Sequence, residues 1–130
     1  MSRQVRVVVV DDDEMQRFLW SLLLSRSGRF EVVGQAANGS EALEVCGECR
    51  PDAVVTDWHM PEVDGLTLAR RLHDDHPKVV VVLCSSTTLD QVPPFFTQLG
   101  ITYLHKVESA ELPQLLDRLV TADRGPVETA

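Results

Sequence analysis

The sequence predicts an α/β protein built on a doubly wound parallel sheet of five strands. Five short runs of β-branched and other apolar residues recur along the chain, and each is followed by a segment whose apolar residues have helical spacing. Asp, Asn, Gly and Pro stand between many of these segments, where helix caps and turns require them. The length of 130 residues is that of one domain.

The first two predicted strands differ in character. Val5–Val10 has the sequence VRVVVV, which predicts a buried strand, and a helix over about Glu14–Ser27 follows it with Asp13 as its N-cap. Phe30–Ala36 has the sequence FEVVGQA, which is more polar. This segment is therefore expected to be a strand at an edge of the sheet.

The third predicted strand, Ala53–Thr56, ends at a single carboxylate, Asp57. The helix before it runs to about Cys49, and either Asn38 or Ser40 can serve as its N-cap. Because open α/β sheets bind their ligands at the carboxyl ends of the strands, Asp57 is a candidate site residue. Taken alone, the same residue also fits a loop position or a helix cap.

A third helix is expected over about Leu66–Asp75, and Pro77 enforces its end. The fourth strand is expected over Lys78–Cys84. The segment after it contains Pro93 and Pro94, and a proline pair removes backbone donors and clashes with the preceding turn of a helix. Only a short helix, starting near Pro93, is expected there.

The fifth strand is expected over Ile101–His105, and Lys106 follows it directly. Ser109 is expected to cap a last helix that runs from Ala110 to about Ala122, in which Pro113 is tolerated because it lies in the first turn. Right-handed crossovers and short loops predict a doubly wound parallel sheet. Two strand orders are common in such sheets, and five strands fit the order 2-1-3-4-5 of flavodoxin-like folds.

In that order strands one and three are neighbours, so Asp11, Asp12 and Asp57 converge at one edge of the sheet. Ser85 and Lys106 lie at the ends of the flanking strands. Three carboxylates close together repel one another, and a divalent cation with oxygen ligands, best Mg²⁺, relieves this repulsion. Asp57 would then be a nucleophile that accepts a phosphoryl group, while Mg²⁺ and Lys106 neutralise the transferring oxygens.

The sequence resembles the receiver domain of two-component response regulators over about residues 6–122. The stretches that carry the resemblance are VVVVDD (Val7–Asp12), TDWHMPEVDG (Thr56–Gly65), the hydroxyl cluster at Ser85 and YLHK (Tyr103–Lys106). The segment Glu31–Gly39 looks most like receivers that carry a C-terminal helix-turn-helix DNA-binding domain. The resemblance implies a two-component signalling protein rather than an enzyme, apart from self-catalysed phosphotransfer and dephosphorylation.

By this resemblance Asp57 is the phosphoacceptor, Asp12 binds Mg²⁺ directly, and Asp11 binds it through water. The backbone carbonyl of His59 is implied as a further metal ligand, and Lys106 is implied to pair with the phosphoryl group. The implied donor is a sensor histidine kinase. Phosphorylation is then expected to shift the surface formed by helix four, strand five and helix five, which regulates an output, expected to be transcription. A homodimer through that face is one option.

Ser85 is implied as the switch hydroxyl and Tyr103 as the switch aromatic, although Cys84 and Ser86 stand beside Ser85 and leave its assignment open. The sequence departs from the family in having Val107 where proline often follows the lysine. The proline pair is unusual for helix four of the family. The proline pair bears on the output surface more than on the phosphorylation chemistry, whereas Val107 bears on the loop after the lysine.

Two other functions fit parts of the sequence. A haloacid-dehalogenase-like phosphatase would use Asp11 as nucleophile and Asp13 as acid and base, but it needs a further acidic pair after the lysine. A receiver-like docking module that no longer switches would keep the fold. Cys46 and Cys49 have CxxC spacing, yet no second pair of ligands accompanies them.

Composition limits which partners the chain can bind and which cellular compartment is expected. A net charge of −8 argues against direct binding of nucleic acid or of an anionic membrane, and no apolar run is long enough to span a bilayer. Three cysteines without a visible secretory signal predict a reducing, cytoplasmic environment. Residues 1–122 are expected to form the receiver domain, and residues 123–130 to form a flexible tail or the start of a linker toward an output domain.

Overall fold

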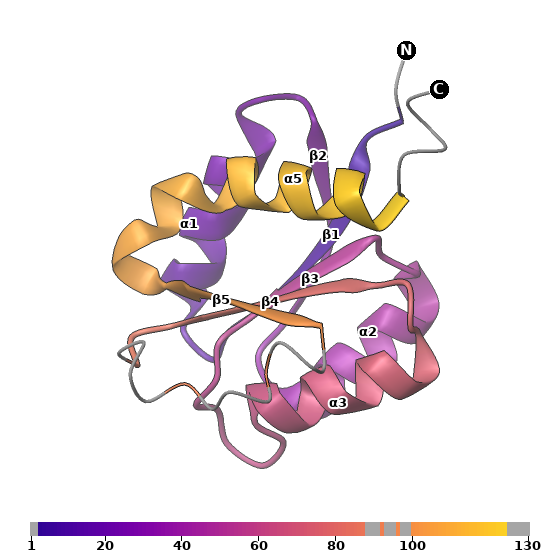
Figure 1. Cartoon of the computed structure of the whole chain (residues 1–130). Coiled ribbons are helices and arrows are strands. Elements are labelled where there is room, and N and C mark those ends of the chain that lie inside the picture. Colours follow the sequence, from indigo (N-terminus) through magenta and orange to yellow (C-terminus); the bar gives the residue numbers. More distant parts are fainter. Residues whose placement is uncertain (1–2, 88–91, 93–95, 97–99, 125–130) are drawn as a thin grey trace.

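The computed structural model describes residues 3–87, 92, 96 and 100–124. They form one parallel sheet in the order β2-β1-β3-β4-β5, as predicted from the sequence (Figure 1). The strands are β1 (Val5–Val10), β2 (Phe30–Ala36), β3 (Ala53–Thr56), β4 (Val80–Ser85) and β5 (Ile101–His105). The helices are α1 (Glu14–Ser25), α2 (Gly39–Cys49), α3 (Gly65–Asp75), the 3₁₀ helix η2 (Lys106–Glu111) and α5 (Leu112–Arg124).

Helices cover both faces of the sheet, and alternate residues of one strand supply both cores. Val7 and Val9 of β1 pack with α1 and α5, whereas Val8 and Val10 pack with α2 and α3. In Figure 1 α1 and α5 lie on one side of the sheet and α2 and α3 on the other. Because β1 is buried on both faces, its sequence is valine at every position except the half-buried Arg6, rather than an alternation of apolar and polar residues.

The strand predictions are confirmed except for the bounds of β4, which ends at Ser85 rather than Cys84 because Ser85 still pairs with His105 of β5. Strand β4 begins at Val80 rather than Lys78, because pairing with β3 begins where Ala53 lies opposite Val80. The residues before it form a turn in which the N–H of Val79 donates to the carbonyl of His76 at 3.0 Å. Strand β2 lies at an edge of the sheet, as its polar character predicted.

The caps of the first three helices settle their starting points. Asp13 caps α1 by accepting from the N–H of Met15, and Asn38 rather than Ser40 caps α2. Asp64 caps α3 by accepting from the N–H of Thr67 at 2.8 Å, so this helix starts one residue earlier than expected. Helix α1 ends at Ser25, two residues earlier than expected.

The expectation that Ser109 caps a helix starting at Ala110 is wrong. After β5 the chain turns directly into η2, and α5 begins only at Leu112, with Pro113 in its first turn. Val107 has an N–H that proline would lack, and this group donates to Nδ1 of His105 at 3.1 Å. Ser109 therefore lies inside the 3₁₀ helix. The short helix expected near Pro93 falls mostly outside the described residues.

Among the described residues, no helix has the length and apolar character that crossing a membrane requires.

Candidate functional site

Three carboxylates meet where β1 and β3 end. The two strands are paired up to Val10 and Thr56, and the N–H of Asp57 donates to the carbonyl of Val10 at 2.9 Å. Oxygens of Asp11, Asp12 and Asp57 consequently lie within 4.8 Å of one another. Asp11 and Asp57 are only 1% and 7% exposed, whereas Asp12 is exposed. The predicted acidic cluster is present.

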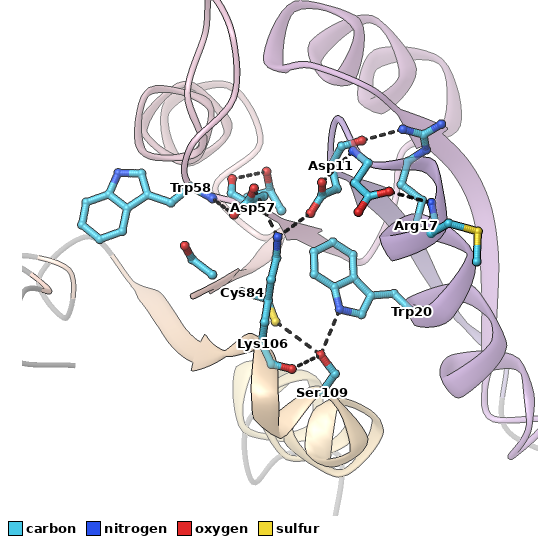
Figure 2. A network of polar contacts seen from close by, with 12 residues as sticks. Asp11, Arg17, Trp20, Asp57, Trp58, Cys84, Lys106 and Ser109 are labelled. Atoms are coloured by element: carbon cyan, nitrogen blue, oxygen red, sulfur yellow. Dashed lines mark hydrogen bonds and ion pairs between the residues drawn. The ribbon is translucent and has the colours of Figure 1, made fainter. Parts of the chain in front are cut away.

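Lys106 reaches this cluster from the far side of β4. Its Nζ lies 3.0 Å from Oδ2 of Asp11 and 3.4 Å from Oδ2 of Asp57, so one ammonium group bridges two carboxylates (Figure 2). Oδ1 of Asp57 accepts from the N–H of Trp58 at 2.8 Å, which fixes the orientation of the carboxylate. The arrangement brings a buried carboxylate and a cation together at the carboxyl end of the sheet.

Burial and neighbouring charges shift the pKa values of Asp11 and Lys106. Burial raises the pKa of Asp11, the negative charge of Asp57 raises it further, and the N–H of Asp13 and the ammonium of Lys106 oppose this. Burial alone would lower the pKa of Lys106, but the contacts with Asp11 and Asp57 outweigh it and raise this pKa. The ammonium group therefore remains charged beside the carboxylates at neutral pH.

The cluster retains unused acceptor capacity. Oδ2 of Asp11 is buried and forms an ion pair with Lys106, but it receives no well-directed hydrogen bond. Three carboxylates, one of them exposed, offer oxygen ligands and an open side to solvent. This donor set fits a hard divalent cation that keeps some of its water.

The register of β4 and β5 decides where the candidate switch residues lie. Ser85 pairs with His105, so it is the last residue of β4 and lies one step before Lys106. Ser85 is buried, whereas Ser86 is exposed and Cys84 packs into the core beneath α1 and α5. Of the three candidates, only Ser85 is a buried hydroxyl at the strand end.

Tyr103 lies next to this strand end. Its hydroxyl donates to the carbonyl of Ser85 at 2.9 Å and also contacts the carbonyl of Thr87. Oγ of Ser85 lies 3.4 Å from Oγ1 of Thr87. Tyr103 therefore ties the segment after β4 to β5, and its ring is only half-buried.

His59 lies on the exposed side of the site. Its ring stacks on Trp58 with 5.2 Å between centroids, and its Nε2 lies 3.0 Å from Oγ1 of Thr87. The side chain thus links the loop after β3 to the segment after β4. Metal binding by the backbone carbonyl of His59 stays a prediction.

The CxxC pair lies at the end of α2, and burial raises the pKa of one of its two thiols. Cys46 is buried, and burial, followed by the charge of Cys49, raises the pKa of its thiol to about 12. Cys49 is half-buried and its Sγ lies 3.4 Å from the carbonyl of Val33. Since the thiolate is the reactive form, these features do not support a redox centre.

Thiol labelling should reflect this. At pH 8 Cys46 should react with a disulfide reagent far more slowly than Cys49, because roughly one Cys46 in ten thousand is then a thiolate. Burial raises the pKa of Cys84 to about 11, so it should also react slowly. Timed labelling with peptide mass mapping measures this, with unfolded protein as the control. Equal rates for Cys46 and Cys49 in folded protein would contradict it.

Sequence reasoning missed two sets of contacts, one around Asp11 and one around Lys106. Arg17 donates from its guanidinium to the carbonyl of Asp11 at 2.5 Å. Trp20, Cys84 and Ser109 form a buried network behind Lys106 (Figure 2). From sequence Trp20 could be recognised only as an apolar residue of a helix. The hydroxyl that accepts its N–H belongs to Ser109, which lies 89 residues further along the chain.

A family comparison and a comparison with individual proteins both find relatives of this chain. The response regulator receiver domain family matches residues 7–117. The chain is 37% identical over 120 residues to the response regulator GacA of Pseudomonas viridiflava. The aligned residues cover 91% of this chain and 56% of that protein. It is 44% identical over 86 residues to a protein-glutamate methylesterase/protein-glutamine glutaminase of Geobacillus kaustophilus. The aligned residues cover 66% of this chain and 25% of that protein.

Solved structures agree with the sequence relatives. The receiver domain of the putative response regulator NarL from Mycobacterium tuberculosis has a TM-score of 0.79 at 31% identity, covering 91% of this chain and 98% of that one. The response regulator domain of Thermotoga maritima CheB has a TM-score of 0.80 at 26% identity, covering 94% and 98%. This chain spans about a quarter of the length of the methylesterase relatives. The chain belongs to the response regulator receiver domain family.

Proposed function

We propose that this receiver domain is a phosphorylation-dependent switch in which Asp57 accepts a phosphoryl group from a sensor histidine kinase. The observation that supports this most is the position of Lys106, whose ammonium lies between the carboxylates of Asp11 and Asp57. A cation at this point can neutralise a transferring phosphoryl group as it reaches the Asp57 oxygen. Oriented by the N–H of Trp58, the carboxylate needs little reorganisation to attack.

The transfer step needs no oxidant or proton donor beyond the reactants. An oxygen of Asp57 attacks phosphorus, and the phosphorus–nitrogen bond to the imidazole of the donor breaks with its electron pair passing to nitrogen. Mg²⁺ would be held by Asp11, Asp12 and Asp57 with the backbone carbonyl of His59, and it supplies positive charge for the transferring oxygens. The product is an acyl phosphate that water hydrolyses.

Signal output is proposed to begin at Ser85. A phosphoryl group on Asp57 offers new acceptor oxygens to the buried hydroxyl of Ser85, which would draw in the segment after β4. Because Tyr103 is hydrogen-bonded to the carbonyls of Ser85 and Thr87, movement of that segment shifts β5 as well. The proposed readout is a population shift of the surface around β5 and α5, where a homodimer could also form.

The proposed output is transcription, supported by the resemblance of the segment Glu31–Gly39 to receivers that carry a helix-turn-helix domain. A different output is supported by the matches to methylesterase/glutaminase enzymes. The chain itself is proposed to act as a phosphoacceptor and not as a turnover enzyme. A reducing cytoplasmic location is part of the same proposal, because a histidine kinase must deliver the phosphoryl group there.

The arrangement of Asp11 and Asp13 speaks against a phosphatase with Asp11 as nucleophile. Oδ1 of Asp11 accepts from the N–H of Asp13 at 2.8 Å, and Oδ2 is paired with Lys106. Oδ1 of Asp13 is occupied in capping α1, where it accepts from the N–H of Met15 at 3.0 Å. Asp13 is therefore a structural cap rather than an acid and base aimed at the cluster.

The identity of the nucleophile can be mapped without mutation. The protein is incubated with acetyl phosphate and Mg²⁺, and the acyl phosphate is then reduced with borohydride, which converts the modified aspartate to homoserine. Peptide mass mapping should place the change at Asp57. A change at Asp11 would overturn the proposal in favour of the phosphatase. No change, after a histidine kinase has also been tried as donor, would favour a docking module without switching.

Asp11→Asn should raise the free energy of unfolding in the absence of Mg²⁺ and reduce the stabilisation that Mg²⁺ provides. Because burial raises the pKa of Asp11 from 3.8, wild type loses stability as pH rises from that value through the raised pKa. Asp11→Asn removes this loss and should be more stable than wild type at pH 7 without metal, since Lys106 keeps Asp57 as its partner. With Mg²⁺ at a hundred times its Kd, wild type should gain about 2.7 kcal/mol.

Thermal unfolding with Mg²⁺ or with EDTA measures both effects. Asp74→Asn, which removes an exposed acid on α3, is the matched control and should follow wild type. Equal stabilisation of Asp11→Asn and wild type by Mg²⁺ would contradict a metal site at the cluster.

A further inference from the structure

The backbone of Lys106 is tied to α1 through a buried hydroxyl. Oγ of Ser109 donates to the carbonyl of Lys106 at 2.6 Å and accepts from Nε1 of Trp20 at 3.3 Å. Sγ of Cys84 lies 4.0 Å from the same hydroxyl. Trp20 is 0% exposed and Ser109 is 5% exposed, so water does not compete effectively for these bonds. Figure 2 shows the network at the backbone end of Lys106, with Trp20 beside the lysine side chain.

Trp20 also faces the other end of the lysine. The Nζ of Lys106 lies 6.0 Å from the centroid of the Trp20 ring, at the outer limit of a cation–π contact. One indole therefore contacts the ammonium group with its face and, through Ser109, holds the backbone carbonyl of the same residue. This pair of residues, Trp20 and Ser109, is called the lysine clamp below.

Lys106 is restrained at its ammonium end by the ion pairs with Asp11 and Asp57, and the clamp supports its backbone end. Its four-carbon side chain has large rotamer freedom, and it must cross β4 to reach the carboxylates. The next residue, Val107, is 82% exposed and lacks the fixed φ that a proline would impose. The clamp is a buried contact that ties the start of η2 to α1.

We propose that Trp20 and Ser109 are positioning residues that hold Lys106 against the carboxylates of Asp11 and Asp57. The inference rests on the proposed function for its effect on phosphotransfer, but the position of the lysine can be measured without it. In the described part of the chain neither residue hydrogen-bonds to the carboxylates, since the partner of Trp20 is Ser109 and the partners of Ser109 are Lys106, Trp20 and Cys84. Both act through Lys106, whose displacement by about 1 Å is enough to slow a reaction that depends on orientation.

The first test measures the order of the lysine itself. The chain has two lysines, Lys78 and Lys106, so protein labelled with ¹³C-lysine gives two Cε signals, and exposed Lys78 is an internal reference. In wild type the Cε group of Lys106 should be more ordered than that of Lys78. In Ser109→Ala and Trp20→Phe, the latter keeping an aromatic ring without the N–H, the order of Lys106 should fall toward that of Lys78.

The second test measures phosphotransfer with acetyl phosphate and Mg²⁺. In Ser109→Ala the rate constant at saturating acetyl phosphate should fall about tenfold, with the half-saturating concentration unchanged within about twofold. Mg²⁺ affinity should not weaken, because the carboxylates are untouched. Ser109→Thr keeps the hydroxyl and should recover most of the rate. Ser21→Ala is the matched control, since it removes another serine-to-carbonyl bond, to Arg17 at 2.8 Å, without touching Lys106.

Unfolding curves confirm that each variant is folded at the temperature used. The clamp is overturned if folded Ser109→Ala and Trp20→Phe keep Lys106 as ordered as in wild type, or if Ser21→Ala loosens Lys106 equally. If wild type forms no adduct on Asp57, the proposed function fails, while the order of Lys106 still decides whether the clamp exists.

Discussion

Asp57→Asn is expected to abolish the phosphoryl adduct, lowering its rate of formation by more than about a thousandfold. An amide has no anionic oxygen with which to form an acyl phosphate. The substitution keeps the shape of the side chain, and its carbonyl oxygen can still accept from the N–H of Trp58. Intact mass after incubation with acetyl phosphate and Mg²⁺ measures the effect. Wild type should gain one phosphoryl group that hydroxylamine removes.

The control for this experiment is another aspartate in the same loop. Asp64→Asn should leave the adduct intact, because asparagine caps a helix as well as aspartate does and can still accept from the N–H of Thr67. Asp11→Asn should slow phosphorylation through loss of a metal ligand but not prevent it. An adduct that survives in Asp57→Asn and disappears in Asp11→Asn would contradict the proposed nucleophile.

Most of the fold could be predicted because apolar runs and helix-capping residues, which determine the strands and the helix starts, are patterns local in sequence. A valine-rich run such as Val5–Val10 specifies a strand buried on both faces, and a capping residue such as Asp13 marks where a helix begins. The start of the last helix could not be predicted in this way. Ser109 resembles a cap in sequence, but its partners are Trp20 and the carbonyl of Lys106, and the former is distant along the chain.

The carboxylate cluster could be predicted for a related reason. Adjacent parallel strands end at the same edge of a sheet, so the residues after β1 and β3 must be close once the strand order is known. Residue contacts that depend on rotamers and loop paths were not accessible from sequence. The bridging position of Lys106 between two carboxylates and the contact of His59 with Thr87 are of this kind.

Gly65→Ala is expected to destabilise the domain by about 3 kcal/mol and to lower its Tm by about 10 °C. A Cβ at this position would lie 2.1 Å from the carbonyl oxygen of Asp57 and 2.9 Å from the Cα of Trp58. Both neighbours are backbone atoms that cannot rotate away. The N–H of Gly65 also donates to the carbonyl of Trp58 at 2.8 Å, so α3 and the loop after β3 are held in close approach.

The same overlap should reach the functional site, because the atom that must yield belongs to Asp57. Gly65→Ala protein that remains folded at low temperature should therefore form the adduct more slowly than wild type. Gly47→Ala is the matched control: a Cβ there meets nothing within 4 Å, and alanine in a helix should stabilise α2 by about 0.5–1 kcal/mol. Opposite shifts of Tm in the two variants would show that helix α3 needs glycine for close approach to Asp57. Similar shifts would show that the loop after β3 can move away without cost.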